Sequence, residues 1–388
     1  MWLKARITQA FGLVNPEDLE KECRQSAGMV MKQVLEREMH NRIDRYLDDL
    51  GRKSSFPNDR RNGHYRRRLL TQLGTLELSV PRTRRTSGLK LIGGLARREK
   101  SVDKLILACF CLGLSTRKVA KTLLQVTGVQ VSPALVSEVC KCLDAEVMRF
   151  HNRPLKDRFQ VLIFDGIAMK EKTPVGLRDR IVLVAMGLRS DGTRELIDFH
   201  LSEKGESQNG WEKFLGMLYH RGLTGEITKV IVTDGNSGLL AAADLFYPGA
   251  LSQRCWAHKA RNVLDEVKRP DRKAVARDLR KVHNAKTQPK ADAALKNFIT
   301  KWAGLYPKAV KCLVKDLDNL FHFRRLAPEL WKPTKTTNYL ERAFEEVRRR
   351  TKIMGVFKNR QSLERILFSV FYFYNQNQVP LFTLTQNT

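Results

Sequence analysis

The amino-acid sequence predicts an α/β fold, a mixed sheet flanked by helices, with helical regions before it and an all-helical insertion within it. Three observations favour this class. The hydrophobic periodicity changes from helical to strand-like after Arg153. The runs then follow the order strand, strand, strand, helix, strand, helix, strand. Four helical segments finally separate the fifth strand from an amphipathic helix near the C-terminus.

Composition and charge narrow the class of partner. The chain has 388 residues, of which 42% are hydrophobic, so it can bury real cores in two or three domains. Its 70 Lys and Arg against 41 Asp and Glu give a formal net charge of +29. Such an imbalance draws a protein to polyanions, and nucleic acid is the first candidate. Ribosomal, nucleoid and membrane-surface proteins share this charge, so the activity has to be argued from sites.

The sequence indicates a cytoplasmic, nucleoid-associated protein. The first residues turn acidic early and carry no long apolar stretch, which argues against a secretory signal. The longest apolar run, residues 105–114, is far shorter than the roughly 20 residues that span a bilayer. Seven cysteines is an odd number, and four of them lie in apolar helical stretches, as reduced thiols do in a reducing compartment.

Residues 1–55 are predicted to form an N-terminal helical region. From Pro16 to about Leu50, apolar residues recur three and four positions apart, as in a helix. This helix has no obvious partner in the rest of the sequence, so it is our candidate for a contact between two subunits. The alternative is a solitary helix packed within its own chain.

Residues 56–96 are predicted to form a basic β-hairpin. Leu76, Leu78 and Val80 alternate with polar residues, as in a half-buried strand. Arginines cluster on either side of this strand and are candidate DNA contacts: Arg60, Arg61, Arg66, Arg67, Arg68, Arg82, Arg84 and Arg85. The cluster is either a clamp on DNA phosphates, which the net charge favours, or a solvated positive face.

Residues 97–152 have the layout of a helix-turn-helix. Ser115 can cap one helix, Gly128 breaks the chain, and Ser132 followed by Pro133 can start the next helix. The candidate DNA contacts in this region are Arg117, Lys118, Ser132 and Ser137. A plain three-helix domain fits the pattern equally well, because many helical bundles contain such a pair.

Residues 153–258 are predicted to form the first part of the catalytic domain. The expected strands are 161–165, 180–188, 195–202, 229–234 and 251–256, with a helix before the fourth and another before the fifth. This is the order of a ribonuclease-H-like fold, in which the first and fourth strands are neighbours. Asp165 and Asp234 are expected at the ends of those two strands. Their carboxylates would therefore converge across 69 positions of sequence.

Residues 259–333 are predicted to be a helical insertion of four segments, broken at Pro270, Pro289 and Pro307. Residues 334–388 then return to the catalytic domain. There, an amphipathic helix begins at Thr337 or Asn338 and carries Glu341 in its first turn.

Two converging carboxylates repel one another, and a divalent cation bound through oxygen relieves that repulsion. A third carboxylate strengthens such a site. Glu341 is the best candidate, and Glu345, one turn later, is the fallback. The plain alternative is that acids are favoured near a helix start by the helix dipole.

Several motifs together resemble the Mutator-type family of bacterial insertion-sequence transposases. They are Phe164-Asp165-Gly166, GESQNGWEKFLGMLYHRGL, Thr233-Asp234-Gly235, PGALSQRCWAHKARNVLD and TTNYLERAFEEVRRRTKIMGVF. The resemblance runs from about Arg61 to Asn377. It implies three catalytic acids that bind metal on an interrupted ribonuclease-H-like fold, and the matching positions are Asp165, Asp234 and Glu341.

Cys255, Trp256 and His258 match another signature of the family, and Asn338 lies near the predicted site. A single C-x-x-H pair is a poor structural zinc site, because such sites need four ligands. We therefore expect Cys255 and His258 to support the wall of the active site or nearby DNA. Trp256 could stack on a displaced base, although tryptophans at strand ends are more often core residues.

The resemblance implies a DNA transposase that binds the terminal inverted repeats of an insertion sequence and cleaves and transfers DNA strands. Two Mg²⁺ ions per active site are expected, with Mn²⁺ able to substitute. The expected partners are double-stranded DNA, as terminal repeats and as target, and a second copy of the chain in a homodimer on DNA. The alternatives are a structure-specific nuclease or resolvase on the same fold, and a domesticated DNA-binding regulator.

Overall fold

The computed structural model describes residues 16–52, 59–94, 97–173, 176–203, 205–352, 354–357 and 359–376. The chain divides into two compact units, one formed by Met1–Cys142 with Pro380–Thr388 and the other by Leu143–Val379. Among the residues described, no helix combines the length and the apolar character that crossing a membrane would require.

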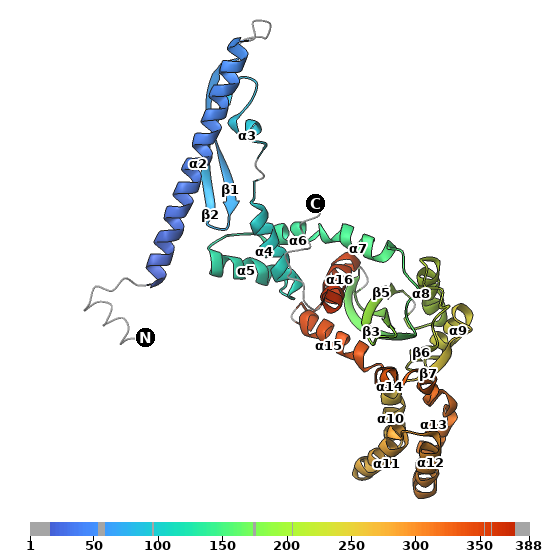
Figure 1. Ribbon diagram of the computed structural model, residues 1–388. Helices are drawn as coiled ribbons and strands as arrows, with labels where there is room; N and C mark the ends of the chain where they lie inside the picture. The colour runs from blue at the N-terminus through green and yellow to red at the C-terminus, as the bar shows by residue number, and fades with distance from the viewer. Residues whose placement is uncertain are drawn as a thin grey trace, which may run out of the picture. The chain divides into compact units, whose positions relative to one another are not determined.

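The first unit is built on a long helix and a β-hairpin (Figure 1). Helix α2 is Pro16–Arg52, and strands β1 (Arg61–Thr71) and β2 (Gly74–Thr83) pair antiparallel. Apolar residues of α2, the hairpin and the short helix α3 (Gly88–Leu91) form one core: Met39, Leu69, Leu78, Val80 and Leu89. Residues 61–83 form an antiparallel hairpin, and this hairpin supplies the partner for the N-terminal helix that the sequence did not reveal.

Glycine at position 88 makes that packing possible. A Cβ atom there would lie 2.7 Å from Cβ of Met39 on α2, closer than carbon atoms approach without a shift of the structure. Only a residue without a side chain lets α3 come so near to α2.

Three further helices complete the first unit. They are α4 (Lys100–Cys111), α5 (Thr116–Thr127) and α6 (Pro133–Cys140). The predicted caps are present, because Ser115 accepts from the backbone N–H of Lys118 and Ser132 accepts from that of Leu135. Gly128 ends α5 in the left-handed conformation, with φ of 68°.

The second unit contains a mixed five-stranded sheet in the order β5-β4-β3-β6-β7. The strands are β3 (Val161–Thr173), β4 (Gly176–Leu188), β5 (Arg194–Ser202), β6 (Val230–Thr233) and β7 (Leu251–Arg254). Strands β3, β6 and β7 run parallel to one another, whereas β4 is antiparallel to both of its neighbours. This order, with the first and fourth strands adjacent, is compatible with a ribonuclease-H-like fold.

Helices cover the sheet (Figure 1). Helices α8 (Gln208–His220) and α9 (Ser237–Phe246) pack on it through a large apolar cluster that includes Leu162, Phe164 and Trp211. Helices α7 (Leu143–Asn152) and α16 (Arg360–Gln376) pack against β5, where the Phe199 ring lies 5.4 Å from that of Phe371. Helix α15 (Asn338–Lys352) packs against β3 and α16.

The helical insertion has its own core. Its helices are α10 (Trp256–Asp265), α11 (Arg272–Asn284), α12 (Gln288–Trp302), α13 (Pro307–Lys315) and α14 (Pro328–Thr334), with short 3₁₀ turns at Arg269–Asp271, Asp318–Leu320 and His322–Arg325. Val263, Leu279, Phe298 and Leu313 belong to a buried cluster within it. Pro289 and Pro307 lie in the first turns of α12 and α13, where a missing N–H costs nothing, so these prolines start helices.

The expected strand ends at Asp165 and Trp256 are wrong. Strand β3 continues to Thr173 and pairs with β4 over its whole length, because Ile167, Met169 and Glu171 are buried on one side of this extension. Strand β7 stops at Arg254, and α10 begins directly at Trp256.

Candidate active site

Asp165 and Asp234 stand at the same level of two adjacent parallel strands. Ile163 of β3 pairs with Val232 of β6. Each aspartate comes two residues after its member of that pair, so both leave the parallel part of the sheet at one edge. The Oδ1 atom of Asp165 accepts from the Gly166 N–H at 2.8 Å, and that of Asp234 accepts from the Asn236 N–H at 2.8 Å.

Glu341 reaches the neighbourhood of the aspartates through His258. It lies in the first turn of α15, which packs against β3. Its Oε1 atom is 3.7 Å from Nε2 of His258, the third residue of α10. Glu345 is exposed one turn further along the helix, and Glu346 pairs with Arg349 and Arg350. Of these three acids, Glu341 is therefore the one placed beside another predicted site residue.

Cys255 connects the segments that carry two of the three acids, Asp234 and Glu341. Its N–H donates to the carbonyl oxygen of Thr233 at 2.8 Å, and its buried Sγ accepts from the N–H of Thr337 at 3.3 Å. Thr233 directly precedes Asp234, and the Glu341 N–H donates to the Thr337 carbonyl at 2.9 Å. The cysteine thus fixes the start of α15 against the end of β6.

Glu206 is an additional acid that the sequence reasoning missed. A Cβ atom on Gly166 would lie 2.3 Å from Oε1 of Glu206, so this carboxylate lies directly over the residue that follows Asp165. Burial raises the pKa of Glu206, the charge of Asp234 adds to the rise, and His258 opposes it. The signal in the sequence was the glycine at position 166, which leaves room for a side chain from elsewhere.

The site concentrates negative charge in a partly buried place. Burial raises the pKa of Asp165 to about 7, and the charges of Asp234 and Glu206 add to this, whereas the Gly166 N–H and His258 oppose it. The neighbouring Cys255 side chain raises the pKa of His258, as do the charges of Asp165 and Glu341. His258 is the one group of this set that brings positive charge.

The donor set suits a hard cation. Carboxylate oxygens are the ligands that Mg²⁺ prefers, and a bound cation would favour the ionised form of Asp165, whose pKa burial raises to about 7. Within the described ranges, no three His, Cys, Asp or Glu side chains stand close enough together to ligate one ion as they are. The acids thus match a divalent cation in ligand type and in charge, whereas their side chains do not form a closed ligand cluster among the described residues.

Arg254 is a second residue that the sequence reasoning missed. It ends β7, and a Cβ atom on Gly235 would lie 0.8 Å from Nη1 of Arg254. Gly235 has a φ of 87°, which also favours glycine. The guanidinium thus lies against the backbone that follows Asp234.

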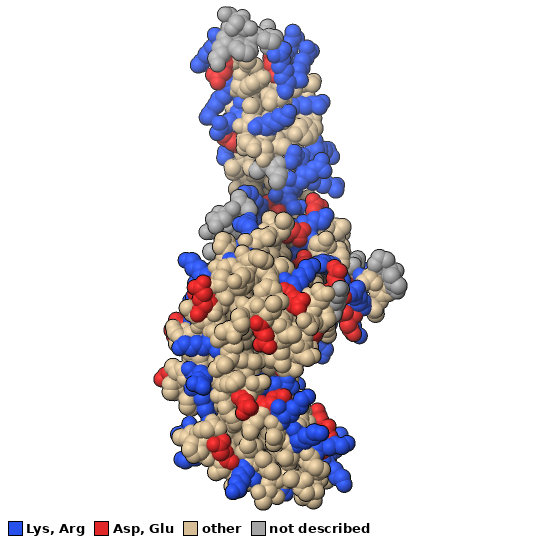
Figure 2. Space-filling model, turned by 90° about the vertical axis from the view of Figure 1, so that its right-hand side faces the viewer, with Lys and Arg blue, Asp and Glu red and all other residues tan. Residues whose placement is uncertain are grey.

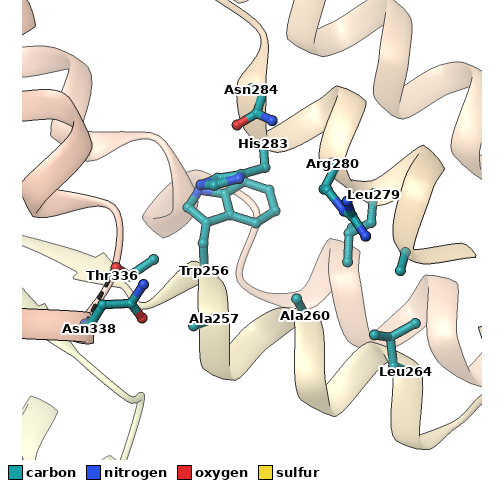
Figure 3. A pocket seen from close by; sticks show the side chains of 11 residues that line it. Trp256, Ala257, Ala260, Leu264, Leu279, Arg280, His283, Asn284, Thr336 and Asn338 are labelled. Carbon is teal, nitrogen blue, oxygen red and sulfur yellow. Dashed lines mark hydrogen bonds between the residues drawn. The ribbon is translucent and has the colours of Figure 1, made fainter. Parts of the chain in front are cut away.

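Trp256 and Asn338 line a cavity whose other walls come from α10, α11 and Thr336. Trp256 is 2% exposed, and its Nε1 donates to the Leu320 carbonyl at 2.7 Å, as expected of the core alternative. Figure 3 shows its ring beside His283, with Thr336 and Asn338 on one side and residues of α10 and α11 along the wall. The ring centroids of Trp256 and His283 are 5.1 Å apart, and the cavity measures about 460 Å³. Helical spacing places His258 on another face of α10.

The comparison with protein families shows which family the chain belongs to. A model of the transposases of the Mutator family matches residues 6–378. The chain belongs to this family.

Similar proteins carry the same description. The transposase for the insertion sequence element IS905 of Lactococcus lactis is 28% identical over 368 residues, which cover 94% of this chain and 92% of that protein. The transposase for the element ISRM5 of Rhizobium meliloti is 32% identical and covers 92% and 87%. The transposase for IS256 in transposon Tn4001 of Staphylococcus aureus is 30% identical and covers 80% of each chain. The chain is a transposase, and family membership implies that it acts on DNA.

The candidate DNA contacts of this transposase lie in the first unit. Arg60, Arg61, Arg66, Arg68, Arg82, Arg84 and Arg85 are exposed, and Arg67 is half-buried. Figure 2 shows Lys and Arg side chains gathered over the part of the molecule that contains α2, β1 and β2. Arg61 is paired with Asp44, and Nε of Arg82 donates to the Asn62 carbonyl at 2.9 Å, so these two are held in place within the unit.

The helix-turn-helix candidates divide by exposure. Arg117 and Lys118 are exposed in the first turn of α5. The Ser132 hydroxyl accepts from the Leu135 N–H at 3.1 Å, and Ser137 is half-buried on α6. Helices α4, α5 and α6 contact one another, which both the DNA-reading and the plain three-helix alternatives require.

Proposed function

We propose that the protein binds the terminal inverted repeats of an insertion sequence and catalyses cleavage and transfer of its DNA strands at Asp165, Asp234 and Glu341. One observation carries the proposal: the two aspartates occupy equivalent positions on adjacent parallel strands, with Glu341 reaching the same neighbourhood beside His258. Such a constellation is suited to phosphoryl transfer, which needs positioning and charge stabilisation more than a protein nucleophile.

The three acids would hold two Mg²⁺ ions, with Mn²⁺ able to take their place. When bound, the metal ions activate a water or 3′-hydroxyl nucleophile and stabilise the leaving oxygen. The chain supplies the negative charge and its placement. Asp165 is held by the Gly166 N–H, Asp234 by the Asn236 N–H, and Glu341 by the start of α15, which Cys255 fixes.

His258 has a positioning role in this proposal. Its Nε2 lies 3.7 Å from Oε1 of Glu341, and its charge also acts on Asp165. The Cys255 side chain and the charges of Asp165 and Glu341 raise the pKa of His258, and the imidazole limits the repulsion between these two acids when it carries a proton.

We assign DNA binding to the first unit. The exposed hairpin arginines would clamp phosphates without reading sequence, whereas Arg117, Lys118, Ser132 and Ser137 would contribute to recognition by the helix-turn-helix. Because an element has two ends and each chain has one set of three acids, the active complex would contain at least two chains. We place this complex on nucleoid DNA in the cytoplasm.

The test is incubation of the full-length protein with Mg²⁺ and duplex DNA that carries the terminal repeats of its element, followed by mapping of the cut strand. Asp165→Asn, Asp234→Asn and Glu341→Gln should each lower cleavage by roughly a thousandfold or more, because several kcal/mol of transition-state stabilisation are removed. Binding of the repeats, measured by gel shift, should persist.

Glu345→Gln is the matched control on the same helix and should cleave normally. An active Glu341→Gln variant beside an inactive Glu345→Gln variant would show that the third acid is misassigned. Equal cleavage of DNA without the repeats would instead favour a structure-specific nuclease.

A further inference from the structure

Helix α2 has two apolar faces, of which the hairpin covers one. Met39 and Ile43 are fully buried, and Gly28 faces Leu76 of the hairpin, with 3.4 Å between a Cβ atom built on Gly28 and Cδ2 of Leu76. On the opposite side, Cys23, Ala27, Val30 and Val34 are all exposed. Val30 is 58% and Val34 47% accessible, which is unusual for β-branched apolar residues on a packed helix.

The exposed residues follow the spacing of a helix-pairing seam. Cys23, Ala27, Val30 and Val34 lie four, three and four positions apart, which is the heptad pattern of residues that face a partner helix. Small side chains at Cys23 and Ala27 would let two backbones approach closely. We name these four residues the outer stripe of α2.

We propose that the outer stripe pairs with the outer stripe of a second copy of the chain, with the two α2 helices antiparallel. This inference deepens the pairing of chains that the proposed function requires. It commits to a register in which Cys23 lies opposite the partner's Val34, and Ala27 lies opposite the partner's Val30.

Charge decides the direction of pairing. Glu20 and Arg37 continue the heptad positions at the two ends of the stripe, and both are exposed. In the antiparallel register, Glu20 lies opposite the partner's Arg37 at each end. In a parallel pair, Glu20 would lie opposite the partner's Glu20, and Arg37 would lie opposite the partner's Arg37. Like charges at such positions are unfavourable. Glu20 is bonded to Arg24 on its own helix at 2.8 Å but remains 71% exposed, so it is open to a second cation.

The size of the stripe indicates a weak contact. Four small or medium apolar residues per chain bury less than the roughly 1,200 Å² of total surface that a stable interface needs. Two chains held on one DNA duplex meet at a high effective concentration, which makes a weak contact sufficient. We therefore expect pairing to be weak without DNA and strong on it.

Disulfide formation in the full-length protein measures the register directly. Val34→Cys should form a covalent dimer through the partner's Cys23 under mild oxidation in the presence of duplex DNA, as seen on a non-reducing gel. In the proposed register the two copies of position 34 are about 16 Å apart, from the rise of about 1.5 Å per residue. Cysteines with Cα atoms more than about 7 Å apart do not bridge. Adding Cys23→Ser to Val34→Cys should thus abolish the dimer.

Charge exchange gives a second readout in the Val34→Cys background. Glu20→Lys should lower the yield of covalent dimer by roughly tenfold, and adding Arg37→Glu should restore it. Glu22→Lys, which makes the same charge change on another exposed face of α2, should leave the yield unchanged. Circular dichroism confirms that each variant is folded.

Three results would overturn the inference. A Cys23–Cys23 dimer of the unmodified protein would indicate a parallel pair, and a dimer that survives Cys23→Ser would indicate another register. The absence of any covalent dimer on DNA would show that something else covers the stripe. None of these results bears on cleavage, which is measured separately, so the proposed function would stand or fall on its own test.

Discussion

In the candidate active site, two glycine positions reveal neighbouring side chains that the spacing of the sequence motifs does not. Asp165, Asp234 and Glu341 were candidates from expected strand ends and from a helix start; in the structure each aspartate follows its member of the Ile163–Val232 pair by two residues, and Glu341 lies beside His258. Glu206 and Arg254 were not candidates, although each lies against the glycine that follows one of the aspartates. Glu206 and Arg254 are distant in sequence from the glycines that they contact, and only the folded sheet brings these parts of the chain together.

Glu206 should contribute to activity through the other acids. Glu206→Gln should lower cleavage about ten- to hundredfold, the usual effect of removing a group that supports a metal ligand. Glu212→Gln, on the helix that follows, is the matched control and should leave cleavage unchanged. Initial rates at saturating Mg²⁺ measure the effect. A Glu206→Gln variant with the normal rate would restrict the site to three acids.

Gly235 should be required for folding at its position. Gly235→Ala should lower the free energy of unfolding by more than about 1 kcal/mol, because it combines a left-handed φ of 87° with a Cβ atom that overlaps Arg254. Gly249→Ala has no neighbour within 4 Å of the added Cβ and should be nearly neutral. Thermal unfolding of both variants is the measurement. Equal melting temperatures would show that Arg254 can move away freely.

At the scale of elements, the sequence predicted those helices and strands whose formation depends on residues close together in the chain. The alternating apolar runs, the caps at Ser115 and Ser132 and the four helical segments of the insertion were all readable from sequence. The extension of β3 to Thr173 was not, because residues 166–173 are strand only through their pairing with β4. Likewise, α2 packs on the hairpin, and the sequence did not predict this contact.

The insertion should lose stability in acid through Asp278. This side chain accepts from Nζ of Lys281 and of Lys301, each at 2.8 Å, and these bonds lower its pKa from 3.8 to about 2. A lowered pKa in the folded state gives stability that is present above about pH 4 and disappears as the pH falls through about 2. Because both lysines are more than half exposed, screening reduces the contribution to about 1–2 kcal/mol.

Asp278→Asn should therefore lower the melting temperature at pH 7, and the difference from the unmodified protein should shrink below pH 4. Asp292→Asn, on the exposed side of α12, is the control and should show little change at either pH. A difference that stays constant down to pH 2 would mean that the Asp278 charge is not what stabilises the insertion.

For the whole molecule, the charge of +29 should act mainly through the first unit. Arg66→Ala and Arg68→Ala in the hairpin should weaken binding to all DNA sequences alike, and each should lower the salt slope by about one, because one phosphate is no longer neutralised. Arg117→Ala in the helix-turn-helix should instead reduce the preference for the terminal repeats. Binding isotherms at several salt concentrations separate the two effects.

Lys308→Ala, on the exposed surface of the insertion, is the control for a change of net charge alone. An equal fall in affinity in this variant and in the hairpin variants would indicate a diffuse positive field and no clamp. An Arg117→Ala variant that keeps full sequence preference would favour the plain three-helix alternative.

The two ends of the helical insertion meet at a single point. The N–H of Trp256, where the chain leaves the sheet, donates to the carbonyl oxygen of Lys335, where the chain returns, at 2.9 Å. The helical insertion therefore leaves and rejoins the sheet-containing part of the unit at one place. The number of residues in the insertion does not affect the distance between Asp234 and Glu341. The chain between Trp256 and Lys335 can therefore be lengthened, shortened or exchanged while Asp234 and Glu341 keep their places, so the number of residues between these two acids is free to vary.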